Sequence, residues 1–283
     1  MIGSVFSPYY AWSGRKDPLN HCAFNVALYG ERARRWAMTE RGREDVRCET
    51  SHLSVGPSSM SWNGDALTIV IDEIAAPFPK RLRGVVRVAP RMFGAQSFML
   101  DAGGRHLWRP IAPAARVEVE MEHPLLRWSG EGYFDANWGD APLEDDFSHW
   151  DWSRAKTADG AFVFYDVLHR DGGRLDLALA IDASGRSYPI GALPRVKLKQ
   201  TLWRMTRWVR SEAQAAVLRT LEDAPFYARS LVSVRLSGEP MLMVHESLSL
   251  DRFATNWVKA LLPFKMPRAP WDVGPGADQA RGS

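Results

Sequence analysis

The sequence has few cysteines, no long hydrophobic run and no segment of one charge sign, and each absence excludes a class of protein. Cys22 and Cys48 could form one disulfide at most, and we expect both thiols to be reduced and buried. No stretch approaches the roughly 18 consecutive apolar residues of a membrane-spanning helix. The N-terminus lacks the apolar core of a signal peptide. We therefore expect a cytoplasmic protein, with peripheral contact to the inner face of a membrane as the alternative.

The short signatures of common enzyme classes are also missing. The chain has no nucleotide-binding glycine loop, no Gly-x-Ser-x-Gly elbow, no His-Glu-x-x-His pair and no Cys-x-x-Cys pair. Its seven histidines show no metal-ligand spacing. Lysine and arginine total 36 against 33 aspartates and glutamates, and no segment is basic enough to indicate a nucleic-acid-binding surface. We expect no cofactor, no metal and no nucleic-acid partner.

Aromatic residues and period-two alternation are what the sequence has in abundance. It contains 12 tryptophans, 12 phenylalanines and 7 tyrosines, enough to fill a core or to line a cavity for a flat apolar ligand. Alternation of polar and apolar residues is strict over residues 116–121 and predicts a strand with one solvated face. Turn signals recur about every ten residues, which is typical of an all-β sandwich or barrel.

Hairpins are the clearest local prediction. The turns Trp62–Asp65, Arg170–Gly173 and Ser237–Pro240 each lie between apolar or alternating segments. One helix is predicted near the C-terminus, where Phe253, Trp257 and Leu261 recur at helical spacing before Pro263. A polar stretch over 140–160 suggests a boundary, so we expect β domains over 1–155 and 156–268 and a disordered tail over 269–283.

The residues between 106 and 152 combine rings with carboxyl groups. On strands, His106 and Trp108 would share one face, and so would Tyr133 and Asp135. A carboxyl group buried beside rings keeps its proton at a higher pH, so Asp135 could protonate a weak base such as an alkene. The ring faces would then attract the resulting cation.

Plainer interpretations of the same residues stay open. Asp135 follows Gly-Tyr-Phe and could be a turn residue, His106 could be structural, and Trp108 could be part of the core. Asp145 and Asp146 lie in a polar run and are expected to be solvated, while Asp140 and Asp151 are the next acids to consider. The pocket could also belong to a carrier that binds an apolar polyene without chemistry, or to a pericyclase or isomerase.

Long strings of the sequence closely resemble the carotenoid 1,2-hydratases, also called hydroxyneurosporene synthases. The resemblance runs from residue 2 to about 268. Longer relatives carry a further segment before the first of these strings, whereas this chain begins only a few residues before it. The strings are 4–12 (SVFSPYYAW), 17–21 (DPLNH), 25–30 (NVALYG), 35–40 (RWAMTE), 132–139 (GYFDANWG), 219–229 (RTLEDAPFYAR) and 245–253 (HESLSLDRF).

The resemblance implies a lipocalin-like, two-part β-barrel or sandwich and a cofactor-independent hydratase of photosynthetic bacteria. Its substrates would be water and an acyclic carotenoid such as neurosporene or lycopene, hydrated at the terminal C1=C2 bond. The family's His-x-Trp and Tyr-x-Asp pairs fall on His106, Trp108, Tyr133 and Asp135. In the expected mechanism, Asp135 protonates C2 and the rings stabilise a cation at C1. A water held by His106, or by Asp135 once ionised, then adds at C1.

Overall fold

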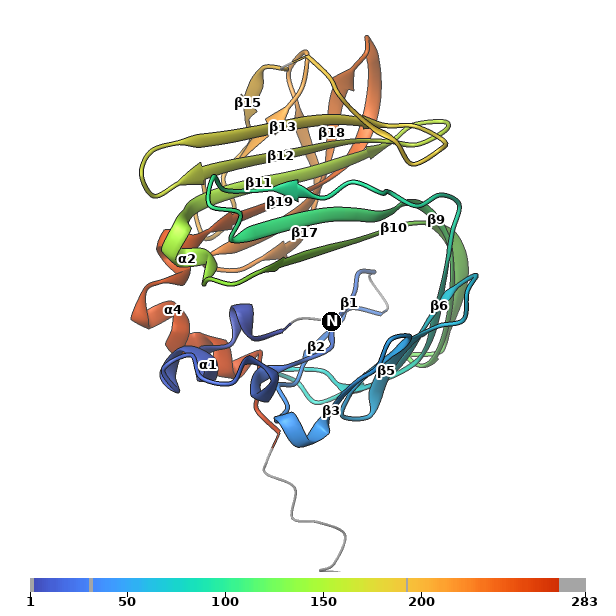
Figure 1. The fold of residues 1–283 in the computed structure, drawn as a ribbon, viewed down its shortest axis with the longest axis vertical. Helices are drawn as coiled ribbons and strands as arrows, with labels where there is room; N and C mark the ends of the chain where they lie inside the picture. The colour runs from blue at the N-terminus through green and yellow to red at the C-terminus, as the bar shows by residue number, and fades with distance from the viewer. Residues whose placement is uncertain (1–2, 31–32, 192, 270–283) are drawn as a thin grey trace, which may run out of the picture. The chain divides into compact units, whose positions relative to one another are not determined.

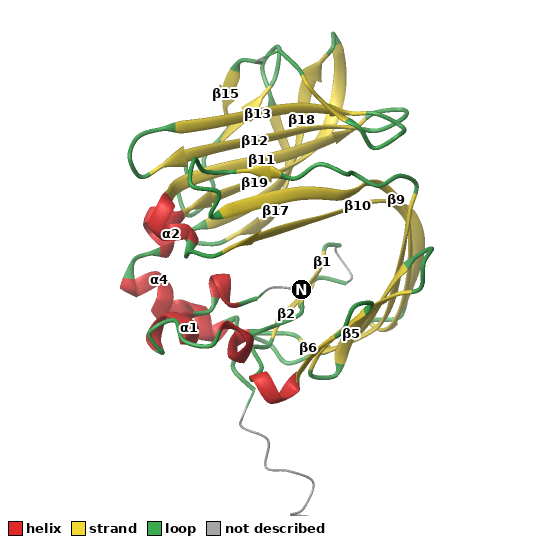
Figure 2. Ribbon diagram, viewed as in Figure 1, coloured by secondary structure: helices red, strands yellow, loops and turns green. Residues whose placement is uncertain are grey.

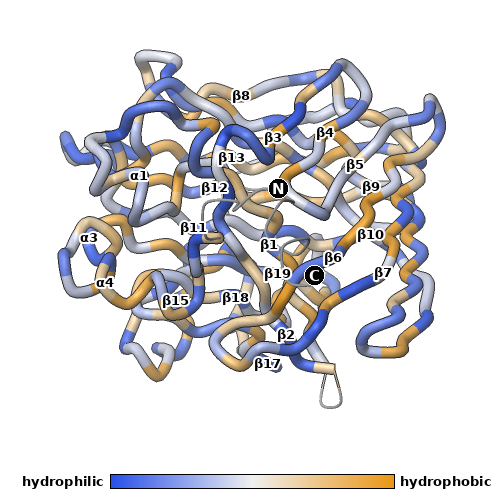
Figure 3. Tube along the Cα trace, turned by 90° about the horizontal axis from the view of Figure 1, so that it is seen from below, coloured by the Kyte–Doolittle hydropathy of each residue, from blue (hydrophilic) through white to orange (hydrophobic). Residues whose placement is uncertain are grey.

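The computed structural model describes residues 3–30, 33–191 and 193–269. Antiparallel strands make up most of this part of the chain and the helices are short, as Figure 2 shows. Figure 3 shows hydrophilic and hydrophobic residues changing at short intervals along the strands, as period-two alternation requires. The prediction of an all-β fold is confirmed. The predicted disordered tail lies, from residue 270 onward, outside the described residues.

The chain forms two compact units, and each unit is assembled from separate segments. Unit 1 contains Met1–Arg87, Glu118–Ser129 and Lys259–Ser283, and unit 2 contains Val88–Val117 and Gly130–Val258. The units therefore differ from the two domains, 1–155 and 156–268, that the polar stretch had suggested.

Two strand arrangements account for this difference. Residue 155 lies inside β11 (Phe147–Lys156), which pairs with β12 (Ala161–His169) in the same unit. The long strands β9 (His106–His123) and β10 (Leu126–Gly139) each contribute residues to both units. Because the boundary between the units crosses these continuous strands, no linker segment marks it in the sequence.

A seven-stranded antiparallel sheet dominates unit 2, in the order β14-β13-β12-β11-β19-β18-β17. Figure 1 shows β13, β12, β11 and β19 following one another in this sheet. Both hairpins predicted for this region are present, β12–β13 and β18–β19. Unit 2 also contains the separate pair β15–β16, the short β8 and the larger parts of β9 and β10. The remaining bounds are β8 Phe98–Met99, β13 Arg174–Ile181, β14 Ser187–Pro189, β15 Arg195–Lys197, β16 Trp208–Arg210, β17 Ala216–Asp223, β18 Tyr227–Leu236 and β19 Glu239–Ser249.

One face of this sheet packs into an apolar core, and alternation decides which side chains enter it. In β18, Val232, Val234 and Leu236 are buried together with Met243 of β19 and Phe164 of β12. Side chains between these positions point to the opposite face of the sheet. That opposite face carries the rings and charges described below.

Unit 1 contains a meander and a small two-stranded sheet. The predicted turn at 62–65 joins β5 to β6, and the Asn63 side-chain oxygen accepts hydrogen bonds from the backbone N–H groups of Asp65 and Ala66. Cys22 is buried, but Cys48 is exposed, contrary to expectation, and both are free thiols. The strands are β1 Asn25–Leu28, β2 Arg35–Met38, β3 Val46–Cys48, β4 His52–Val55, β5 Ser58–Trp62, β6 Leu67–Ile74 and β7 Arg81–Pro90.

The predicted short C-terminal helix is present but divided into α3 and α4. Phe253 is buried, whereas Trp257 is 50% and Leu261 43% exposed, so the predicted apolar stripe is wrong beyond its first residue. At the break, the backbone N–H and the hydroxyl of Thr255 both donate to the carbonyl of Arg252. No helix among the described residues is long and apolar enough to span a membrane. The helices are α1 Pro8–Trp12, α2 Leu143–Asp146, α3 Leu250–Phe253 and α4 Asn256–Leu261, with single 3₁₀ turns at Ser4–Phe6, Pro18–His21, Arg43–Asp45 and Leu262–Phe264.

Candidate functional site

Three of the four predicted site residues meet through the carboxyl group of Asp135. The indole Nε1–H of Trp108, on β9, donates to Asp135 Oδ2 at 2.7 Å. The hydroxyl of Tyr133, two residues before Asp135 on β10, donates to the same oxygen at 3.1 Å. Trp108 is fully buried, while Tyr133 and Asp135 keep partial access to solvent. The carboxyl group of Asp135 therefore borders accessible space and has the rings of Trp108 and Tyr133 beside it.

Further rings from β11 and β12 extend this aromatic surrounding. Trp152 and Tyr165 are directly opposite each other in the register of the two strands and so share one face. The ring centroids of Tyr133 and Trp152 are 5.4 Å apart, and those of Trp108 and Tyr165 are 5.5 Å apart. Trp150 follows at 5.8 Å from Tyr165. These spacings are those of favourable ring pairs, so the rings hold one another in place.

The surroundings of Asp135 favour its neutral form. Burial is the largest effect and raises the pKa of Asp135 from 3.8 to about 6. The hydrogen bond from Trp108 lowers this pKa, the negative charge of Glu246 raises it, and the bond from Tyr133 lowers it. Burial also raises the pKa values of Tyr133 and Tyr165 well above 10, so both hydroxyls keep their protons. A substantial fraction of Asp135 is protonated at slightly acidic pH.

Positive charge also reaches this cluster. The guanidinium of Arg154 lies over the ring of Tyr133, 5.1 Å from its centroid, and donates to the carbonyl of Pro113. One face of Tyr133 therefore already has a cation beside it. Trp152 is partly accessible, whereas Trp108 is fully buried, so Trp152 is the ring better placed beside a second cation.

His106 lies in a neighbouring polar pair. Its Nε2 is 2.7 Å from Asp146 Oδ2, and its ring packs against Phe147 at 4.6 Å. Asp146 also pairs with Arg105 and has a side chain only 11% exposed. The expectation that Asp146 is solvated is wrong, because α2 turns its carboxylate toward two basic partners that a polar run in the sequence does not reveal.

Asp151, a reserve candidate for the acid, is on the other face of β11. Ser247 donates to its Oδ1 at 2.5 Å, and His149 Nε2 is 3.2 Å from its Oδ2. Burial alone would raise the pKa of Asp151, but the hydrogen bond and charge of His149 bring it below its usual value. Asp151 is thus a charged, fully paired carboxylate that does not face Asp135.

Trp152, Tyr165 and Glu246 were not predicted as site residues. Trp152 alternates with Trp150 and could have been found from period two alone. Tyr165 and Glu246 join the site through strand register, which depends on pairing between segments up to about a hundred residues apart and leaves no local signal.

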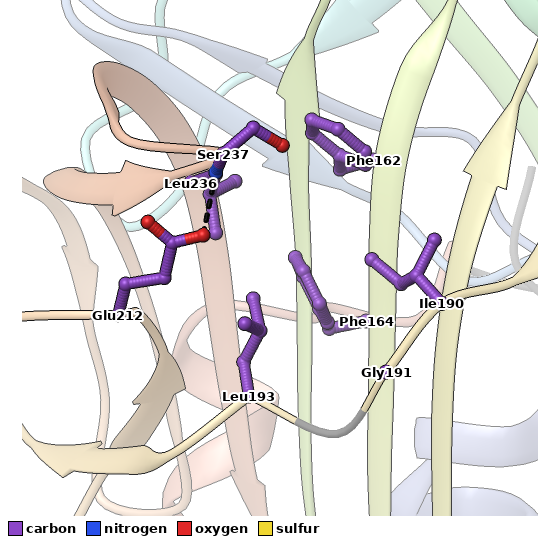
Figure 4. A pocket seen from close by; sticks show the side chains of 8 residues that line it. All are labelled: Phe162, Phe164, Ile190, Gly191, Leu193, Glu212, Leu236 and Ser237. Carbon is purple, nitrogen blue, oxygen red and sulfur yellow. Dashed lines mark hydrogen bonds between the residues drawn. The ribbon is translucent and has the colours of Figure 1, made fainter.

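A separate pocket of about 290 Å³ lies on the core side of the same sheet (Figure 4). Phe162 and Phe164 line it and alternate along β12 with Tyr165, so it is on the opposite face from Asp135. Its carboxylate, Glu212, accepts hydrogen bonds from the backbone of Ser237 and Gly238. This pocket is therefore distinct from the acid site.

Within the described part of the chain, no three His, Cys, Asp or Glu side chains are arranged to hold a metal ion.

Comparison with known proteins gives consistent matches over nearly the whole chain. A family model described as Carotenoid hydratase CrtC matches residues 1–273. The acyclic carotenoid 1,2-hydratase of Thiocapsa roseopersicina is 56% identical over 274 residues, which are 95% of this chain and 68% of that protein. The enzyme of the same name from Cereibacter sphaeroides is 42% identical over 272 residues, covering 95% and 97% of the two chains.

A solved structure supports the fold. The crystal structure of a protein assigned as AttH from Nitrosomonas europaea superposes with a TM-score of 0.56 at 14% identity and covers 77% of this chain and 76% of that one. At that identity the likeness concerns the fold alone. It confirms the lipocalin-like β architecture.

Proposed function

The chain belongs to the carotenoid hydratase CrtC family, and we propose that it adds water across the terminal C1=C2 bond of acyclic carotenoids, with Asp135 as the acid. The observation that carries this proposal is the carboxyl group of Asp135, which has a pKa of about 6 and lies among rings. An alkene is a very weak base, so its proton donor must be neutral and poorly hydrated. With a pKa of about 6, Asp135 keeps its proton in part of the population near neutral pH, and the surrounding rings limit its contact with water.

In the first step the O–H bond of Asp135 breaks and its proton forms a C–H bond at C2. A tertiary cation results at C1, the more substituted carbon. The face of Trp152 and the free face of Tyr133 stabilise that positive charge by about 2 kcal/mol or more each where water is excluded, and the buried Trp108 holds Asp135 and Tyr165 in place. Because the rings are fixed by mutual contacts and hydrogen bonds, they need not reorganise as the charge develops.

In the second step a water forms the C1–O bond and the protonated alcohol releases a proton. Asp135, ionised by the first step, becomes the acid again when that proton reaches it. His106 was the other candidate for holding this water, but its Nε2 is bonded to Asp146. Its role in the proposed mechanism is to position the β9 strand beside Asp146 and Phe147.

We further propose that the protein takes its substrate from a membrane surface, because an acyclic carotenoid dissolves in lipid rather than in water. Leu202 of unit 2 is 95% exposed, and Leu125 and Phe264 of unit 1 are 88% and 70% exposed. Transfer of each of these apolar side chains from water into lipid is favourable. Binding to phospholipid vesicles that weakens on Leu202→Ser or Phe264→Ser substitution supports this contact. Equal binding by all variants contradicts it.

Incubation of the purified protein with lycopene in D₂O tests the reaction itself. A product heavier by one water, with deuterium at C2, is the expected result. Bound but unchanged lycopene would instead identify a carrier, and an isomer without added water would identify an isomerase or pericyclase.

A further inference from the structure

A row of five side chains crosses the sheet of unit 2 on the face that carries the rings. The register pairs Glu222 with Arg229, Arg229 with Glu246 and Glu246 with Trp152, and Trp152 in turn with Tyr165. Residues directly opposite each other on antiparallel strands present their side chains to the same face. Glu246 is therefore the direct neighbour of Trp152, whose ring contacts Tyr133 beside Asp135.

Arg229 compensates the charge of Glu246 at one oxygen. Its Nη2 and Nε lie 2.8 and 2.9 Å from Oε1 of Glu246, and its Nη1 lies 3.3 Å from Glu222. The side chain of Glu246 is 23% exposed, so it borders accessible space rather than lying in a dry core. A charged carboxylate in this position can accept a hydrogen bond from a water.

Asp135 and Glu246 have opposite environments. Asp135 is surrounded by rings without a basic partner among its hydrogen bonds, whereas Glu246 is paired with a guanidinium. Glu246 is close enough for its charge to raise the pKa values of both Asp135 and Tyr165. Two nearby carboxyl groups of unequal environment divide the roles of acid and base between them.

We propose that Glu246 is a second catalytic carboxylate, which holds the water that adds at C1 and accepts its proton. This inference rests on the proposed hydration. After Asp135 has protonated C2, an oxygen lone pair of the water forms the C1–O bond. The O–H bond then breaks and the proton goes to Glu246. Its transfer to the Asp135 carboxylate, directly or through solvent, restores both groups, and no electron donor or acceptor is needed.

The experiment separates capture of the cation by water from formation of the cation. Wild-type protein and the Glu246→Gln variant are incubated with lycopene in D₂O. Deuterium is then measured in the hydrated product and in the recovered unhydrated carotenoid, whether at C2, in the C1 methyl groups or in a double-bond isomer. Glu246→Gln should hydrate about 10²-fold more slowly, as for loss of a general base. The ratio of label in unhydrated carotenoid to hydrated product should rise, because cations still form but lose a proton instead of gaining water.

Two further variants keep the result interpretable. Glu222→Gln removes a carboxylate from the other side of Arg229 and should keep the wild-type ratio. Glu246→Asp keeps the charge and should recover part of the hydration. A Glu246→Gln variant that hydrates at the wild-type rate, or loses hydration and labelling in equal proportion, overturns the role of Glu246. A wild-type protein that neither hydrates nor labels lycopene overturns the proposed function itself.

Discussion

Replacing Asp135 with asparagine should stabilise the fold at neutral pH, because asparagine does not have to carry a charge in a buried aromatic site. The pKa of Asp135 is about 6 in the folded protein and 3.8 is its ordinary value. Below pH 3.8 the carboxyl group is protonated in both folded and unfolded chains and contributes no pH dependence. Between pH 3.8 and 6 the unfolded chain ionises more readily, so the wild-type protein loses stability as the pH rises.

The full difference corresponds to about 3 kcal/mol. Since Asp135 keeps partial contact with solvent, we expect about 1–3 kcal/mol. The free energy of unfolding is measured by urea titration of both proteins at pH 4 and pH 7.5, followed by tryptophan fluorescence. The stability difference, variant minus wild type, should be larger at pH 7.5 by that amount. All other titrating groups are common to both proteins and cancel. A difference that is the same at both pH values would refute the raised pKa of Asp135.

Other substitutions test the neighbours of Asp135 and the scaffold. Trp108→Phe removes the hydrogen-bond donor that lowers the pKa of Asp135, so the pH at which kcat/KM falls on the alkaline side should be higher than in the wild type. If that pH is unchanged or lower, the hydrogen bond does not have this effect. Tyr133→Phe keeps the ring beside Trp152 and should lose less hydration rate than Tyr133→Leu; equal losses would assign the role to the hydroxyl. Arg210→Met leaves buried Asp166 without its partner at 2.5 Å and should cost about 3–5 kcal/mol in urea unfolding, and a loss below 1 kcal/mol contradicts a structural ion pair.

The local features of this fold could be predicted from sequence because they depend on neighbours along the chain. Period two and the turn chemistry at Asn63 and Gly172 predicted the hairpins that the structure contains. The division into units could not be predicted, because β9 and β10 are single strands that contribute to both. The apolar stripe predicted through Trp257 was wrong because α3 ends at Phe253 and α4 begins at Asn256, so one helical spacing does not run through both.

The site shows the same limit. Spacing by two residues correctly placed Tyr133 and Asp135 on one face of a strand, and the structure adds that Trp108 bonds the same carboxyl oxygen. The partner of His106 is forty residues away and follows from the turn of α2, not from spacing. Glu246 comes beside Trp152 only through the pairing of β11 with β19, which sequence alternation cannot specify.

The rate of lycopene hydration by Asp135→Asn tests the central claim most directly. Asparagine preserves the shape of the side chain but cannot supply and recover a proton, while the rings and the fold remain. The account predicts a folded variant that still binds lycopene and forms the hydrated product at least about 10²-fold more slowly than the wild-type protein. Hydration by Asp135→Asn at a rate near that of the wild type would show that the proton comes from another group.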